Sequence, residues 1–384
     1  MEHLDYDILV VGAGLTGGVI ARELAEAGRR VCIWDRRSHI GGNMYDERDA
    51  HGILVQRYGP HTFHTKERAL YDYMCRYEDW EPYRLTCGAE IDGQFTPTPF
   101  NFRTIDQLYA PNAAKELKAH LAQAFPGQAT ATVVEVMTCD DPLVKAYGQL
   151  LFAKDYSLYT AKQWGIAPEK VDPSILRRVP LRFSYDEGYF DDAYEVMPRH
   201  SFTTFFEHLY DHPGIEVRLG VEALDHLAVA DDRLLLDGAP CPVPVVYTGA
   251  LDELFRRDLG PLPYRSLRFE WHHEDVDEIQ PYPVTAYPQA EGYTRITEYK
   301  KLPVQQAEGT TYAVEYPLLY EPGKAQEPYY PLLTAESQQA AEAYKARAAR
   351  VKDFYPCGRL ADFQYYNMDQ ALKRALDVAA RMHG

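Results

Sequence analysis

A glycine-rich turn between an apolar run and a helical segment constrains this chain more than any other feature. Residues 7–18 read DILVVGAGLTGG, and residues 31–37, VCIWDRR, form a second apolar run that reaches an acid. A helical segment over 19–27 separates the two runs. This order of strand, turn, helix, strand and acid is typical of a βαβ unit that holds a dinucleotide.

The individual residues of this unit have distinct expected tasks. Gly12 permits the tight turn, Gly14 lets the backbone approach a pyrophosphate, and Gly17 allows the helix to pack closely on the strand. The helix start offers free N–H groups to phosphates, and Asp35 would accept a hydrogen bond from a ribose hydroxyl. A turn without a ligand would explain the glycines, but not Asp35 and the later pair Gly41-Gly42 together.

Composition limits the class of protein. The 384 residues suffice for two or three cores, and 46% hydrophobic with 25% charged residues is typical of a globular chain. We expect no transmembrane segment and a cytoplasmic location, because no apolar run approaches about 20 residues and the N-terminal apolar run is already a strand. Six scattered cysteines indicate reduced thiols, and the net charge of −17 argues against nucleic acid as a partner.

The pattern along the chain predicts an α/β protein of three parts. A discontinuous Rossmann-like dinucleotide-binding domain takes residues 1–80, about 215–255 and 340–384. A helical-bundle insertion takes about 102–180, where the texture is mostly helical. An antiparallel β-sheet domain takes about 81–101, 181–214 and 256–339, which are rich in short runs of period two.

An ordered series of motifs spans the whole chain: GAGLTGG at 12–18, HIGGN at 39–43, YGPHTFHT at 58–65, PFN at 99–101, LYTAKQWG at 158–165, RRVPLRFSYDEGYFDDAY at 177–194, YTGALDELF at 247–255, YRSLRFE at 264–270, YTRITEYK at 293–300, EPYYP at 327–331 and CGRLADFQYYNMDQ at 357–370. Together they resemble the bacterial UDP-galactopyranose mutases, flavoenzymes that interconvert UDP-galactopyranose and UDP-galactofuranose. Each motif is modest alone, and the ordered set is specific.

The resemblance implies FAD as cofactor, active when reduced, rather than NAD. In this family N5 of reduced FAD acts as nucleophile on the anomeric carbon, with no net redox change, and the product supplies galactofuranose for cell-surface glycans. An external flavin reductant is therefore implied. The positions that match cofactor contacts are Gly12, Gly14, Thr16, Gly17, Asp35, Arg36, Gly42, Asn43, His61, Thr62, Arg359 and Met368.

The resemblance also makes the discontinuous Rossmann-like domain an FAD-binding domain, and it implies a UDP-sugar site with a mobile substrate flap around Arg178 in the helical insertion. Arg178 and Arg295 match paired arginines that neutralise the departing pyrophosphate, and His61 is a candidate acid or base with a pKa near working pH. Tyr159 and Trp164 match the uridine side, and Phe152 is a further candidate there. The remaining substrate candidates are Tyr189, Tyr329, Tyr365 and Asn367.

Three positions depart from the family pattern and leave the exact nucleotide sugar open. Asn367 replaces an Asp, Ala286 an Asn, and Leu85 a polar residue. The same chemistry on UDP-N-acetylgalactosamine is thus an alternative. Less favoured are an amine-oxidase-like FAD oxidoreductase and a non-enzymatic nucleotide sensor, neither of which uses the arginines. We expect a homodimer or a larger homo-oligomer.

Overall fold

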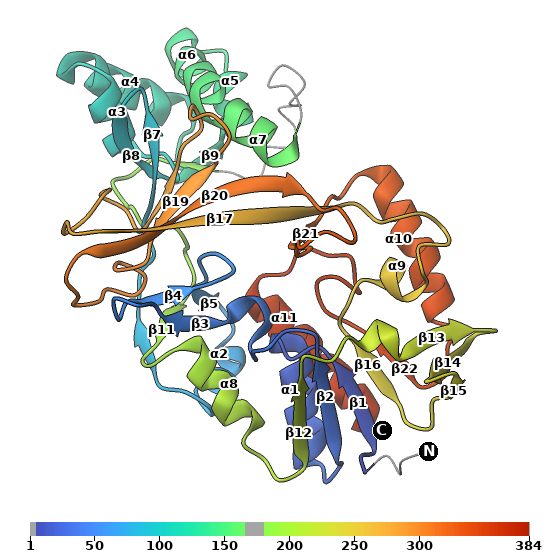
Figure 1. Cartoon of the computed structure of the whole chain (residues 1–384). Helices are drawn as coiled ribbons and strands as arrows, with labels where there is room; N and C mark the ends of the chain where they lie inside the picture. The colour runs from blue at the N-terminus through green and yellow to red at the C-terminus, as the bar shows by residue number, and fades with distance from the viewer. Residues whose placement is uncertain (1–4, 166–179, 384) are drawn as a thin grey trace.

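The computed structural model describes residues 5–165 and 180–383 in three regions (Figure 1). A parallel sheet with its helices lies at the bottom of the view. A long twisted sheet crosses the middle, and a group of short helices lies at the top.

The parallel sheet is assembled from distant parts of the chain. Its strand order is β12-β2-β1-β16-β22, and every pairing in it is parallel. The strands are β1 (Ile8–Val11), β2 (Val31–Asp35), β12 (Ile215–Leu219), β16 (Val245–Tyr247) and β22 (Phe354–Pro356). β1 and β2 are nearly continuous in apolar residues and almost wholly buried, as strands covered on both faces must be.

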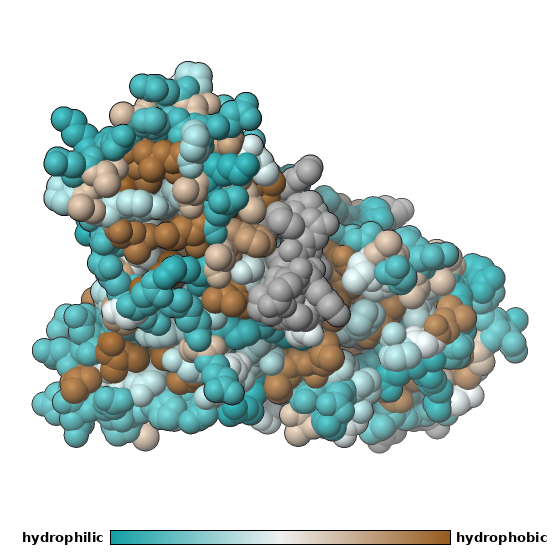
Figure 2. Space-filling model, turned by 90° about the horizontal axis from the view of Figure 1, so that it is seen from above, coloured by the Kyte–Doolittle hydropathy of each residue, from teal (hydrophilic) through white to brown (hydrophobic). Residues whose placement is uncertain are grey.

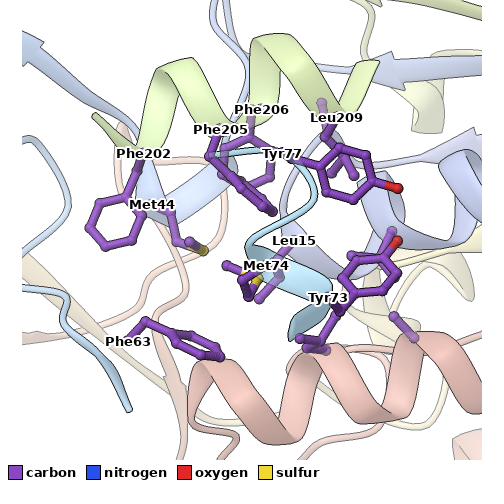
Figure 3. Packing of buried hydrophobic residues seen from close by; sticks show 14 of the residues in the cluster. Leu15, Met44, Phe63, Tyr73, Met74, Tyr77, Phe202, Phe205, Phe206 and Leu209 are labelled. Carbon is purple, nitrogen blue, oxygen red and sulfur yellow. The ribbon is translucent and has the colours of Figure 1, made fainter. Parts of the chain in front are cut away.

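Helices from both ends of the chain cover one face of this sheet. α1 (Leu15–Glu26) packs along α11 (Met368–His383), and α8 (Phe202–Tyr210) lies against α1. Figure 3 shows Phe202, Phe205, Phe206 and Leu209 of α8 pointing into a core with Leu15, Met44, Phe63, Met74 and two tyrosines. α8 lies within 181–214, which the sequence analysis gave to the sheet domain. Its apolar face packs on α1, in a core that also contains residues of the central sheet.

The central sheet has seven strands in the order β21-β17-β20-β19-β18-β7-β8. All neighbours are antiparallel except β18 and β7, which run parallel, so the sheet is mixed rather than purely antiparallel. The strands are β7 (Cys87–Ile91), β8 (Gln94–Thr98), β17 (Tyr264–Glu274), β18 (Val284–Ala286), β19 (Arg295–Glu298), β20 (Thr310–Leu319) and β21 (Tyr330–Pro331).

The helical region packs around its own apolar core. It contains α3 (Phe102–Leu108), α4 (Pro111–Ala124), α5 (Val133–Met137), α6 (Pro142–Leu151) and α7 (Ser157–Trp164). Asp141 caps α6 by accepting two backbone N–H bonds. Between α6 and α7 the chain makes a π-helical turn over Phe152–Tyr156, which keeps the three segments continuous. Such turns are frequent at functional sites.

Short elements connect these regions. The remaining helices are α2 (Arg68–Met74), α9 (Leu251–Leu254) and α10 (Ala335–Ala348). The remaining strands pair in small sheets: β3 (Asp46–Arg48) with β4 (Leu54–Gln56); β5 (Phe63–Thr65), β11 (Tyr194–Pro198) and β6 (Trp80–Pro82); β9 (Thr130–Thr132) with β10 (Pro180–Arg182); and β13 (Leu227–Ala230), β14 (Arg233–Leu236) and β15 (Ala239–Pro240).

The view from above in Figure 2 shows hydrophobic residues in groups, interrupted by hydrophilic ones. Among the helices of the described residues, none is long and apolar enough to span a bilayer.

Candidate active site

A first cavity opens over the carboxyl ends of the parallel strands, where the glycine turn lies. Gly12, Gly14 and Gly17 line it. Gly12 has φ of +108°, and a Cβ on Gly17 would stand 2.0 Å from the Gly12 carbonyl oxygen. Gly14 is the N-cap of α1 and offers no side-chain cap. The first N–H groups of α1 are thus left for a ligand, and phosphate is the group that such a helix start favours.

Charged side chains hold the outer part of this cavity in shape. Asp35 accepts hydrogen bonds from the backbone N–H groups of Ala13 (2.7 Å) and Arg37 (2.8 Å), which ties the end of β2 to the glycine turn. Glu327 forms ion pairs with Arg36 (2.6 Å) and Arg37 (2.9 Å). The Arg37 guanidinium also donates to Asn43 (2.9 Å). Asp35, Arg36, Asn43 and Glu327 all line the cavity.

The first cavity meets a second, larger one that lies between the central sheet and α7. His61, Arg359, Tyr366, Asn367 and Met368 line both. Met368 begins α11, so the positive end of a helix dipole lies at this junction. The two cavities together extend from the glycine turn, past the junction, to the helical region.

Arg295 brings a partly buried positive charge into the second cavity. It stands directly across from Glu315 in the β19–β20 register, and its Nε and Nη2 donate to Oε2 of that carboxylate at 2.8 and 2.7 Å. The Glu315 side chain is 3% exposed. Burial alone would lower the arginine pKa, but the carboxylate outweighs it and raises the Arg295 pKa well above its usual value. The guanidinium therefore stays charged, with donors left for a second anion.

His61 is held as a neutral ring. Its Nδ1 lies 2.8 Å from the Gly59 carbonyl oxygen, which can only accept, so Nδ1 carries the proton and Nε2 is an acceptor. Burial, followed by the positive charges of Arg359 and Arg295, lowers the His61 pKa to about 4. The sequence led us to expect a pKa near neutrality. That expectation is wrong because the ring is enclosed beside two arginines.

The expected tyrosines divide between the two cavities. Tyr159, Tyr189 and Tyr365 line the second cavity, whereas Tyr329 lines the first. Its neighbour Tyr330 faces the second cavity instead, stacks on Tyr365 at 5.3 Å and lies under the Arg359 guanidinium at 5.0 Å. Consecutive residues of an extended chain point to opposite sides, so only one of the pair can face each cavity.

The other candidates fall at several places. Thr16 lines the first cavity, and Thr62 lines the second rather than the first. Phe152 does not line either cavity; it packs against the helical-region core. Trp164 ends α7, but its side chain lies outside the described residues, as does Arg178.

Charged lining residues that the sequence expectations did not include are Arg182, Asp155 and Glu222, among others. Arg182, 6% exposed, lines the second cavity and pairs with Asp191 at 2.9 Å. Asp155 of the π-helical turn is 7% exposed and lines it as well. Glu222 lines the far part of the first cavity. The sequence could have indicated Asp155, because it is an acid within the mostly helical stretch 142–163. No local sequence feature indicates that Glu222 lies at the site.

The departures noted in the sequence all lie at this site. Leu85 and Ala286 line the second cavity, and Asn367 lies at the junction. Two apolar side chains therefore face the space where the family pattern has polar ones.

The residues present fit FAD. The glycine turn, an uncapped helix start and Asp35 provide sites for pyrophosphate and ribose at one end. A Cβ on Gly42 would stand 2.9 Å from the Gly14 Cα, so the close approach of these two glycines leaves the backbone open to a ligand. At the junction, Arg359 and the α11 start can stabilise negative charge on a flavin ring.

Comparison with known proteins agrees with this arrangement. Residues 10–77 match the model of an NAD(P)-binding Rossmann-like domain, and residues 154–365 match that of UDP-galactopyranose mutase. The chain is 34% identical to a UDP-galactopyranose mutase of Mycoplasma pneumoniae, over 98% of this chain and 96% of the relative. It is 32% identical to a dTDP-fucopyranose mutase of Escherichia coli, with 97% of both chains covered.

Solved structures share the fold over nearly the whole chain. A reduced UDP-galactopyranose mutase superposes with a TM-score of 0.68 at 15% identity, covering 98% of this chain and 95% of that one. A putrescine oxidase superposes with a TM-score of 0.55 at 12% identity, with 98% of each chain covered.

The fold and the site thus define an FAD-dependent enzyme with a Rossmann-like domain and an anion site beside its cofactor cavity. Within that class, the chain belongs to the UDP-galactopyranose mutase family, whose members are isomerases.

Proposed function

We propose that this enzyme interconverts the pyranose and furanose forms of UDP-galactose. The observation that supports this function most is that the cofactor cavity and the second cavity meet at a shared junction. Arg295 lies in the second cavity, where it can bind an anionic substrate. A diphosphate held by Arg295 would leave the attached sugar near the junction.

In this proposal, bound reduced FAD supplies the nucleophile for the anomeric carbon, and an external reductant keeps it reduced. Arg295 binds the diphosphate as it leaves. Glu315 occupies two of its five N–H donors, and the rest remain for phosphate oxygens. The fixed ion pair presents the guanidinium in one orientation, which limits the entropy lost on binding.

The remaining side chains bind and orient. Tyr189, Tyr330 and Tyr365 bring phenol hydroxyls to the second cavity as donors to the diphosphate. Nε2 of His61 accepts a hydrogen bond from a sugar hydroxyl and so holds the sugar at the junction. Arg178 stays a prediction for the second diphosphate arginine, and the expected homo-oligomer is open to light scattering.

The test uses dithionite-reduced holoenzyme with UDP-galactofuranose, and product is followed by chromatography. We expect UDP-galactopyranose to accumulate, and oxidised enzyme to be inactive. If reduced enzyme rearranges no nucleotide sugar, the proposed reaction is wrong.

A second candidate is the same reaction on a dTDP-6-deoxyhexose. Leu85 and Ala286 favour it, because apolar walls suit a methyl group better than a hydroxyl. A relative named dTDP-fucopyranose mutase is 32% identical to this chain, against 34% for the UDP-galactopyranose mutase of Mycoplasma pneumoniae. Comparison of kcat/KM for UDP-galactofuranose and dTDP-fucofuranose on one preparation decides between them.

A further inference from the structure

A column of side chains on the helical wall of the second cavity contains an acid that the proposed reaction does not use. Asp155, Tyr159 and Gln163 follow one another at intervals of four residues, and all line the cavity. Residues four apart lie on one face of a helix. Tyr156 and Thr160 form a parallel column beside them and line it too.

Asp155 is buried without a described partner. Its side chain is over nine-tenths buried, and no hydrogen bond or ion pair joins it to another residue of the described ranges 5–165 and 180–383. The nearby Lys162 amine is taken up by three carbonyl oxygens, of Tyr287, Ala290 and Tyr293, at 2.5 to 2.9 Å. The carboxyl group thus faces the cavity with capacity to bind a ligand.

A second polar group beside it is also unpartnered. The Tyr156 hydroxyl is buried and makes no hydrogen bond among the described residues, although the side chain is 6% exposed and lines the same cavity. A buried polar group without a partner is costly, so two such groups next to each other indicate a polar ligand.

The carboxyl group of Asp155 restricts which part of the ligand it can meet. Burial raises the pKa of Asp155 to about 7, and in its ionised form the carboxylate repels a diphosphate, which belongs with Arg295 near the junction. Tyr159 follows Asp155 by four residues, and both line the same cavity as Arg295. If the nucleobase of the substrate packs on the Tyr159 ring, its edge lies next to Asp155. The group of the base that meets Asp155 is then a neutral hydrogen-bond donor.

We propose that Asp155 selects the nucleobase by accepting a hydrogen bond from the imide N3–H of uracil or thymine, with the Tyr156 hydroxyl as a second contact to the base edge. The proposal rests on the proposed function, because it presumes a nucleoside diphosphate in the second cavity. Since uracil and thymine share the imide, Asp155 does not separate UDP from dTDP.

The test measures binding by calorimetry on oxidised holoenzyme with UDP, N3-methyl-UDP and 2′-deoxy-UDP. At pH 8, above the Asp155 pKa of about 7, we expect the wild type to bind N3-methyl-UDP at least about 10-fold more weakly than UDP, the usual loss for a hydrogen bond to a charged group. Asp155→Ala should reduce that ratio below about 3. Asp155→Asn keeps an acceptor of the same size and should give an intermediate ratio.

Asp191→Asn is the matched control, because Asp191 is another acid that lines the second cavity. It should keep the wild-type ratio for N3-methyl-UDP. The 450 nm absorbance of bound FAD verifies that each variant is folded.

Two results would overturn the inference: an unchanged N3-methyl ratio in Asp155→Ala, or a change confined to the 2′-deoxy-UDP ratio, which would assign Asp155 to the ribose. Failure of the proposed function is distinct, since then the wild type would bind none of these nucleotides.

Discussion

Arg295 combines a permanent charge with a fixed direction, because Glu315 holds it from the next strand. Removing it leaves a buried carboxylate unpaired and the diphosphate without its strongest donor in the described cavity wall. We expect Arg295→Ala to lower kcat by about 100-fold or more, the usual effect of losing a group that stabilises a developing charge. FAD should stay bound, because Arg295 does not line the first cavity.

Arg268→Ala is the control, since Arg268 lies on the same sheet but is half-exposed and lines neither cavity. Its kcat should equal that of the wild type. Loss of the yellow FAD colour in Arg295→Ala would show that the arginine serves the cofactor instead.

The lowered pKa of His61 makes stability depend on pH. Below about pH 6.5 the unfolded chain binds a proton on this histidine, whereas the folded protein does so only near its pKa of about 4. Stability is therefore lost as pH falls from 7 to 5, by an amount on the order of 1–2 kcal/mol from this group.

Urea unfolding of wild type and His61→Gln at pH 7 and pH 5 measures this effect. Between pH 7 and pH 5 the unfolding free energy of the wild type should fall more than that of His61→Gln. An unchanged difference would mean that His61 titrates at its ordinary pKa when folded.

At the scale of elements, two glycines of the same turn have different tasks. Gly17 is needed for folding, whereas Gly14 is needed for cofactor binding. A Cβ on Gly14 would meet only the Gly42 Cα, at an ordinary 3.6 Å, whereas a Cβ on Gly17 would collide with the Gly12 carbonyl at 2.0 Å. We expect Gly14→Ala to fold with a normal apo-protein melting temperature and to bind FAD at least about 10-fold more weakly. Gly17→Ala should lower both the apo-protein melting temperature and the affinity for FAD.

Apo-protein melting curves and FAD titrations of the two variants check this expectation. Equal behaviour of the two variants would contradict it.

The sequence predicted elements well where a local period determines them. The period-two runs at 215–219 and 233–236 predict strands with the bounds of β12 and β14, and the amphipathic pattern from Met368 onward predicts the C-terminal helix α11. The parallel pairing of β18 with β7 was not predictable, because register between distant strands depends on packing rather than local pattern. For the same reason Tyr329 and Tyr330 could not be told apart, since their sides depend on the position of β21.

Site prediction depended on the kind of signal. The nucleotide residues follow a turn whose geometry requires glycine, so the positions 12, 14 and 17 could be read directly. Arg295 and Tyr159 came from motif resemblance, and both lie at the second cavity. Asp155 and Arg182 were missed because a lone charge in a helix or strand is usually solvent-facing, and only the fold shows these two buried.

For the whole molecule, the cofactor cavity is lined by residues from both ends of the chain, 12–17 and 358–371. Ligand binding to the folded state alone stabilises it by about 2.7 kcal/mol at 100 times Kd. We expect removal of FAD to lower the melting temperature and added FAD to restore it. Calorimetry of apo-protein with increasing FAD measures the shift, and a melting temperature independent of FAD would contradict a built cofactor site.

The packing of α1 against α11 sets the order in which this protein can mature. The residues that line the cofactor cavity come from both 12–17 and 358–371, and the last helix covers the first. A chain in which α11 is not yet folded lacks that cover and part of the cavity wall. Stable capture of FAD therefore requires α11 to be packed on α1, however early the first βαβ unit forms.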